Sequence, residues 1–289
     1  HKETSMKLSM KTAAFALAIS ALPALAQFEG VIDMKMEGSS AAPMSGTGRT
    51  YVTKGAWRTE MEMTSEKMKT DPEAVKALGG KAAFKMVMLG KLSEPGISYM
   101  INDVAKTYSR LDAAEMAKNL PKDKDRKWTV KRLGKDHVAG LACENVKATE
   151  EGKKSEWELC VTKDIPSGEW VRAMQRQQRG SQGLWMKALQ DAGIDGYPVR
   201  MVMRESASGP VTMRMEATKV ERRSLPGSLF EIPPGYKETG MMGMFVQTPE
   251  QAKQMEDAQK QLNEAMKNMT PEQRKQMEEM MKKMGQQKQ

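Results

Sequence analysis

Histidine and cysteine, the residues on which most catalytic and metal sites depend, are nearly absent from this sequence. Its 289 residues include two histidines and two cysteines. His1 lies in the N-terminal segment that is predicted below to be a signal peptide with upstream residues, so only His137 is left for the mature chain. A serine–histidine–acid triad would have to use His137, and a zinc or iron site with several histidine ligands is excluded. No phosphate-binding glycine loop, HExxH, GxSxG or calcium-loop motif occurs. We therefore predict a protein that is not an enzyme, with no catalytic residue and no cofactor.

Aromatic residues are also few, and positive charge is not gathered in one place. Aromatics make up 5% of the chain, and the formal net charge is +9. Lysine and arginine alternate with acids, as in "KDKDRK" at 122–127, a pattern typical of a solvated surface. Because nucleic-acid binding favours a basic patch with stacking aromatics, we predict no nucleic-acid partner.

Long apolar runs are missing too. The run Thr12–Leu22 is too short to span a bilayer. It follows a short basic region and precedes Ala24–Ala26, a small-x-small cleavage site. The next residue is Gln27 rather than cysteine, which excludes the lipid-anchored form of signal. We predict that residues 1–26 are a signal peptide with upstream residues. The protein would then be periplasmic or secreted in a bacterium, and not membrane-spanning.

Alternating apolar and polar residues dominate the next part of the chain. In "FEGVIDMKME", for example, Ile32, Met34 and Met36 share one side and charged residues the other. Period two with one polar side indicates an antiparallel sheet. "GSSAAPMSGTG", residues 38–48, is interpreted as a flexible connection between two strands. We predict a mainly β (α+β) domain at 27–238.

Two stretches are expected to be helical within this domain. A short helix should begin at Pro72 with Asp71 as its cap. A longer one is predicted in residues 167–193, where Trp170, Ala173, Met174, Leu184, Trp185, Ala188 and Leu189 recur at helical spacing. Such a helix buries its apolar stripe against a sheet.

The two cysteines are placed to form a disulfide across a hairpin. Glu151 and Gly152 lie between them and read as the tip of the turn. If these two residues are the tip, residue i faces residue 303 − i, so that Cys143 lies directly opposite Cys160. In an exported protein a disulfide is the expected state of such a pair.

Four stretches together resemble the exported bacterial family called domain of unknown function 4412. They are "FEG" at 28–30, "YMINDVAKTYSRLD" at 99–112, "GLACENVKATEEGKKSEWELCVTKDI" at 140–165, and "LPGSLFEIPPGYKE" at 225–238. The resemblance implies a curved antiparallel half-barrel sheet wrapped around one helix, similar to periplasmic lipoprotein carriers. Relatives of that architecture hold acyl chains between sheet and helix. The family itself implies no established activity.

Methionine is the most unusual component, with 28 residues. Five Met-x-Met pairs fall on predicted strands, and residues i and i+2 of a strand share one face. The predicted ligand-binding residues are these pairs and one tryptophan: Met34, Met36, Trp57, Met61, Met63, Met86, Met88, Met201, Met203, Met213 and Met215.

Three interpretations of these pairs stay open on sequence grounds. Methionine can be a flexible core filler, or it can line a pocket for acyl chains of varied shape. It can also bind Cu(I) through its soft thioether sulfur, although histidine and free cysteine, the usual co-ligands, are not placed beside it. We predict a periplasmic binding protein for lipid or another hydrophobic small molecule, with Cu(I) binding as the alternative.

The C-terminal part of the chain is organised differently. After a linker at 239–247, "TPEQAKQM" at 248–255 is nearly repeated as "TPEQRKQM" at 270–277. Threonine, proline and glutamate in this order predict helix starts. Residues 248–289 are therefore predicted to be a Met-rich helical tail, which could bind a protein partner or act as a chaperone-like module.

Overall fold

Twelve strands form one sheet in the part of the chain that the computed structural model describes. That part is residues 28–39, 43–78, 80–118, 127–165 and 181–240, with Thr248 and scattered positions between 250 and 264. The strands are β1 (Gly30–Gly38), β2 (Met44–Val52), β3 (Ala56–Ser65), β4 (Phe84–Lys91), β5 (Ile97–Asn102), β6 (Thr107–Asp112), β7 (Trp128–Val138), β8 (Leu141–Glu150), β9 (Glu156–Thr162), β10 (Tyr197–Arg204), β11 (Val211–Arg222) and β12 (Lys237–Glu238). The helices are α1 (Glu66–Thr70), α2 (Pro72–Ala77), α3 (Ala113–Lys118), α5 (Ser181–Asp191) and the 3-10 turn η1 (Gly227–Phe230).

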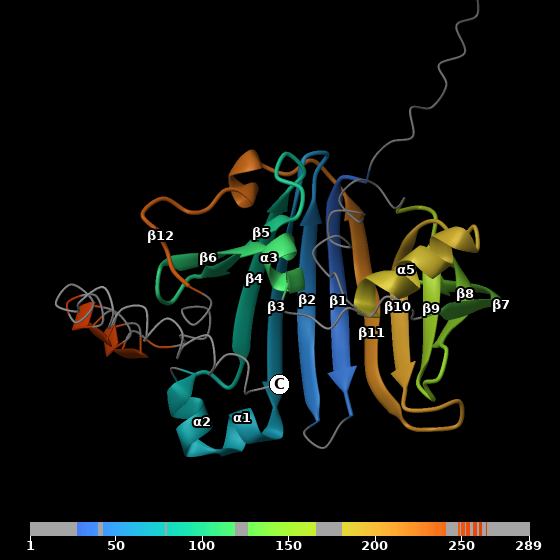
Figure 1. Ribbon diagram of the computed structural model, residues 1–289, viewed down its shortest axis with the longest axis horizontal. Coiled ribbons are helices and arrows are strands. Elements are labelled where there is room, and N and C mark those ends of the chain that lie inside the picture. Colours follow the sequence, from blue (N-terminus) through green and yellow to red (C-terminus); the bar gives the residue numbers. More distant parts are fainter. Residues whose placement is uncertain are drawn as a thin grey trace, which may run out of the picture.

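The sheet has two arms that meet at β1 and β11. Strands β1 to β6 follow one another along the first arm, and β11 back to β7 along the second. Neighbouring strands are antiparallel, except that β12 runs parallel to β6 at the edge of the first arm. Figure 1 shows β1 and β11 side by side near the centre of this open sheet. The predicted mainly β, curved antiparallel architecture is therefore confirmed.

Short-range sequence signals decide where the strands turn and the short helices begin. The β7–β8 hairpin turns through Ala139 and Gly140, which have φ of 50° and 79°. Positive φ at both central residues is the requirement of the tight two-residue hairpin turn. Asp71 accepts hydrogen bonds from the backbone N–H groups of Glu73 and Ala74, and Pro72 is the first residue of α2. The predicted cap and start of this helix are confirmed.

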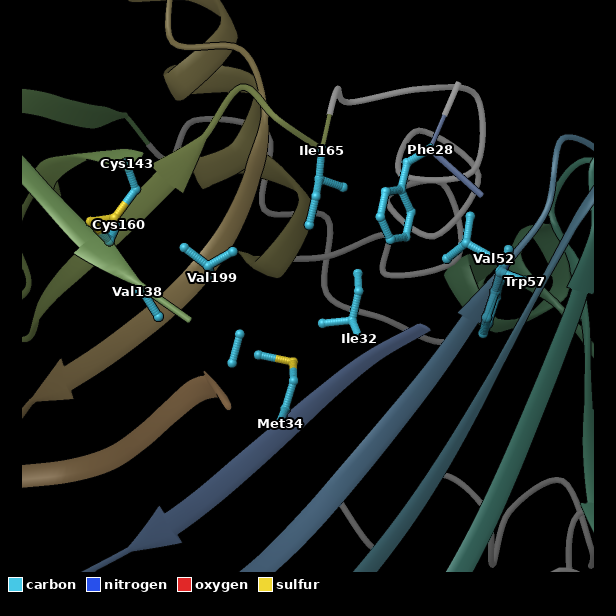
Figure 2. Close-up of a cluster of buried hydrophobic side chains, with 11 residues drawn as sticks. Phe28, Ile32, Met34, Val52, Trp57, Val138, Cys143, Cys160, Ile165 and Val199 are labelled. Atoms are coloured by element: carbon cyan, nitrogen blue, oxygen red, sulfur yellow. A yellow bond between two sulfur atoms is a disulfide. The ribbon is translucent and has the colours of Figure 1, made fainter. Parts of the chain in front are cut away.

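Apolar side chains pack on both sides of the sheet, but in different places. On one side, Ile32, Val52 and Trp57 of the first arm meet Val199 of the second. Figure 2 shows these side chains converging on one cluster with Phe28. On the other side, Val87, Leu89 and Ile101 pack against the C-terminal segment through Phe230. Each side therefore has its own core.

The C-terminal segment of the domain, residues 225–238, packs on the face of the first arm that carries Val87 and Leu89. Leu229 and Ile232 pack beside Phe230, and Tyr236 donates a hydrogen bond from its hydroxyl to Asp103 at 2.9 Å. The segment then enters the sheet edge as β12, with Lys237 opposite Thr107. Residues 225–238 thus cover one face of the first arm and close its edge.

Helix α5 packs against the end of the second arm (Figure 1). Trp185 and Leu189 are buried against Val146 of β8 and Leu159 of β9. These two helical residues belong to the stripe predicted for the 167–193 helix. Residues 166–180, with the predicted positions Trp170, Ala173 and Met174, lie outside the described part of the chain.

The predicted disulfide is confirmed, but the register predicted for its hairpin is wrong. Cys143 and Cys160 are bonded, with their Cα atoms 5.3 Å apart. Asn145, rather than Cys143, lies directly opposite Cys160, and the last ladder pair before the turn is Thr149 with Glu156. The loop is longer than the two-residue tip that the sequence suggested. The disulfide therefore joins residues that are diagonal across the ladder.

Removing this disulfide is expected to lower the free energy of unfolding by about 3 kcal/mol, because the bond closes a loop of 17 residues in the unfolded chain. The double substitution Cys143→Ala and Cys160→Ala avoids leaving one free thiol. Urea unfolding of the oxidised wild type and of this variant measures the difference. The same loss should follow from reducing the wild type, and an unchanged midpoint would contradict the expectation.

The two ends of the chain lie mostly outside the described residues. The predicted signal peptide at 1–26 and most of the predicted tail at 248–289 lie outside the described residues. At the start of the tail, Thr248 accepts a hydrogen bond from the backbone N–H of Gln251 at 3.0 Å, which is a helix-cap contact. Within the described residues, no helix is both long enough and apolar enough to cross a membrane.

Candidate binding face

The ladder register places all five Met-x-Met pairs on one face of the sheet. Residues directly opposite each other in an antiparallel ladder point to the same side. One row across the sheet reads Phe84, Met63, Gly46, Met36, Met215, Met201, Leu159 and Val146. The adjacent row reads Met86, Met61, Gly48, Met34 and Ala217. The eleven predicted residues therefore share one side, which we call the methionine face.

Two glycines of β2, Gly46 and Gly48, divide this face into two groups of methionines. Gly48 lies opposite Met34 on one side and Met61 on the other. A Cβ atom at Gly48 would meet the Cε methyl of Met36 at 3.8 Å, so this side chain leans over the glycine. At Gly46, a Cβ atom would meet the side chain of Met63 at 3.2 Å and the carbonyl oxygen of Glu62 at 2.4 Å. We call the two glycines the glycine strip, which the flexible side chains of Met36 and Met63 flank.

The glycine strip corrects the interpretation of residues 38–48 as a flexible connection. Met44–Gly48 belong to β2 and are paired with strands on both sides. The available signal was the alternation of Gly46 and Gly48 with polar residues at 45, 47 and 49. Glycine is depleted in strands, because it has no side chain to pack. That preference outweighed the period-two pattern at the sequence level.

One end of the methionine face is closed by buried side chains. Trp57 is 2% exposed, and its indole lies over Gly90 on the adjacent strand. Met34 is 9% exposed, and the hydroxyl of Tyr197 points to its sulfur at 3.7 Å. Burial raises the pKa of Tyr197 to about 12. Figure 2 shows Met34 and Trp57 within the buried cluster.

The nine other predicted methionines of the face are partly exposed, and so is Met100 of β5, which lies opposite Met88. Away from the buried end, Met61 and Met86 lie opposite each other in the first arm, and Met203 and Met213 in the second. Beyond Met201, the face continues onto the fully buried Leu159, which α5 covers. The accessible part of the methionine face therefore lies between the buried cluster that contains Met34 and Trp57 and the buried Leu159 beneath α5.

Outside the core around Phe230, the opposite face of the sheet is charged. Asp33 accepts a hydrogen bond from Arg49 Nε at 2.6 Å, and Lys85 pairs with Glu62 at 3.1 Å. Such exposed pairs contribute at most about 1 kcal/mol each to stability. A groove of about 490 Å³ is lined by Asp33, Thr47, Arg49, Glu60, Glu62, Lys85, Asp103 and Thr218, and also by Met34, Gly48, Met61, Met86 and Val87. This lining mixes charged side chains with residues of the methionine face.

His137 is exposed near the end of β7 and lies opposite Ala142. Its backbone N–H donates to the carboxylate of Asp136 at 2.8 Å. Hydrogen bonds from Arg200, then from this N–H and from Asn145, lower the pKa of Asp136 to about 2. Among the described residues, no three histidine, cysteine, aspartate or glutamate side chains are grouped so as to hold a metal ion.

These observations define a class of protein: an open antiparallel sheet with one methionine-lined face, one charged face and a disulfide. The chain belongs to the family described as domain of unknown function DUF4412, whose model matches residues 28–236. The family resemblance of the four sequence stretches is thereby confirmed. A comparison with curated proteins finds no match.

A comparison with solved structures finds several chains that are similar to this one at low TM-scores and low identity. An uncharacterized conserved protein from Thermus thermophilus has a TM-score of 0.39 and 9% identity, covering 73% of this chain and 91% of that one. A chain of the Pseudomonas aeruginosa MucA/MucB complex has a TM-score of 0.36 and 11% identity, covering 71% and 56%. The LolA superfamily protein NE2245 from Nitrosomonas europaea has a TM-score of 0.24 and 11% identity, covering 71% and 90%. At these scores, the function must be argued from this chain's own residues.

Proposed function

We propose that the protein is a periplasmic, non-enzymatic binding protein that holds an acyl chain of a lipid, or another hydrophobic small molecule, on its methionine face. The observation that carries the proposal is the pairing of partly exposed methionines on both sides of the glycine strip. A core filler has no need of an accessible surface, whereas a binding face does. Methionine is unbranched and flexible, so the same face can fit ligands of varied shape.

The expected gain in free energy is adequate for binding. Burying about ten methylene groups at about 0.8 kcal/mol each gives about 8 kcal/mol before the cost of association. In this proposal the chain lies along β2 over Gly46 and Gly48, and the methionines of β1 and β3 swing aside to flank it. The predicted 167–193 helix covers the ligand, with the sheet wrapped around it. The charged face stays in water.

Native mass spectrometry of the protein purified from a bacterial periplasm tests this proposal. We expect a mature chain that begins at Gln27 and carries a bound lipid, which is lost when the protein is unfolded. A fluorescent fatty acid should bind to the delipidated protein with a saturable increase in emission. If neither a bound lipid nor probe binding is detected, the proposal fails.

Gly48→Val is expected to weaken binding of the fluorescent fatty acid by about 15-fold, because displacing about two methylenes costs about 1.6 kcal/mol. The space above Gly48 admits a Cβ atom at ordinary contact distance. The nearest atom, the Cε of Met36, ends a flexible side chain that can move away from the valine methyl groups, so the variant should fold. Thr47→Val is the matched control, since Thr47 is the neighbouring residue of the same strand and faces the charged side. Equal affinities for the two variants would place the ligand elsewhere.

A further inference from the structure

One region of the methionine face brings more sulfur together than the others. Met36 of β1 lies directly opposite Met215 of β11, which in turn lies opposite Met201 of β10. In the next row, Met213 of β11 lies opposite Met203 of β10. We call these five residues on three adjacent strands the thioether block. Five separate pairs are visible in the sequence, and the register alone identifies this block among them.

The spacing within the block is short enough for several sulfurs to reach one point. Cβ atoms of directly opposite residues are about 5 Å apart, and diagonal ones about 7–8 Å. A methionine sulfur lies two bonds beyond Cβ on a flexible chain, so three neighbouring thioethers of the block can converge. Small residues flank it, because Met36 lies opposite Gly46 and Met213 opposite Gly38.

The other methionines of the face are less suited to a common site. The sulfur of Met34 already faces the hydroxyl of Tyr197, and its partner on β11 is Ala217. In the first arm, Met61 and Met86 are opposite each other, but Met63 lies opposite Phe84 and Met88 opposite Thr59. Met88 also lies opposite Met100 of β5, so the first arm has two directly opposite methionine pairs, which share no residue. The block has three such pairs, and two of them share Met215.

From this arrangement we propose that the thioether block binds a soft monovalent metal ion, Cu(I). Neutral thioethers select Cu(I) over zinc and other harder ions, which favour imidazole and carboxylate ligands. Acidic and histidine side chains suited to a harder ion are not grouped in the described residues. All five block methionines are partly exposed, so an ion has access to the sulfurs. The acyl proposal needs an apolar face, whereas this site needs the sulfur atoms, so replacing methionine by leucine separates the two.

The test is an anaerobic titration of the full chain with Cu(I) against a chromogenic chelator. Two variants with four leucine substitutions each are compared with the wild type. The first changes the second-arm methionines: Met201→Leu, Met203→Leu, Met213→Leu and Met215→Leu. The second changes the matched first-arm group: Met61→Leu, Met63→Leu, Met86→Leu and Met88→Leu. Leucine keeps the face apolar and removes only the sulfur.

We expect the wild type to take Cu(I) from the chelator. The first variant should lose the Cu(I) ion that the wild type binds most tightly, and the second variant should still bind it. Ag(I) should shift the methyl resonances of the block methionines in a spectrum of the wild type labelled at methionine methyl groups. Equal Cu(I) binding by both variants, or no competition by the wild type, overturns the proposal. Circular dichroism and fatty-acid binding report separately whether each variant is folded and whether the acyl proposal holds.

Discussion

Trp57→Ala is expected to destabilise the protein by about 3–5 kcal/mol, the cost of removing a large buried aromatic side chain. Trp57 is 2% exposed and joins the core of the first arm to that of the second. Within the described residues, no partner accepts a hydrogen bond from its indole N–H, so the ring is held by packing. Urea unfolding followed by circular dichroism measures the change, and a loss below about 1 kcal/mol would contradict a well-packed ring.

The packing of Trp57 also predicts a strong coupling with Gly90. A Cβ atom at Gly90 would lie 2.5 Å from the indole, closer than carbon atoms can approach. Gly90→Ala should therefore cost about 1–3 kcal/mol in the wild type through overpacking. In the Trp57→Ala background, the same change should cost almost nothing. Gly48→Ala is the control, because its Cβ atom meets its nearest neighbours at 3.8–3.9 Å.

Oxidation of the methionine face is expected to weaken binding of the acyl ligand strongly. Hydrogen peroxide transfers one oxygen atom to a thioether sulfur and leaves water, which turns an apolar side chain into a polar sulfoxide. Two sulfoxides beneath an acyl chain, at about 1.5 kcal/mol each, weaken binding by about 100-fold. Fatty-acid affinity before and after peroxide treatment measures the effect, and peptide mapping identifies the oxidised positions.

The order of oxidation should follow exposure along the face. Met61 and Met203, which are partly exposed, should react before Met34, which is 9% exposed. Methionine sulfoxide reductases should restore the affinity, because this step of oxidation is reversible. Unchanged affinity in a protein whose face methionines are shown to be oxidised would contradict the acyl site.

The parts of the fold that could be predicted are those with a local cause. Alternation along β1 and β3 placed Met34, Met36, Met61 and Met63 on one side of their strands, and the ladders confirm it. The cap at Asp71 and the buried helical residues Trp185 and Leu189 also follow from local spacing. Alternation determines the side of a strand on which a residue lies. Because directly opposite residues point to the same side, the register then determines which residues of the neighbouring strands share that face.

The parts that could not be predicted depend on partners that are distant in the sequence. The pairing of β1 with β11 brings Met36 to Met215, and nothing near either residue specifies the other. The disulfide register was wrong by two residues, because the loop after Thr149 is longer than its glycine suggested. The parallel pairing of β12 with β6 likewise depends on tertiary packing, because the core around Phe230 positions the segment that leads into β12.

The junction of β1 with β11 has a consequence for how the molecule assembles. It pairs Gly30 with Arg222 and Gly38 with Met213, whereas the other antiparallel pairings join strands that follow one another in the chain. Loop closure over such separations is slow, and local hairpins form first. We expect each arm to form as a separate meander during folding and the junction to close last. The methionine face spans this junction. A chain that ends before β11 would therefore lack the strand that joins the two arms, and the methionines of the two arms would not form one continuous face.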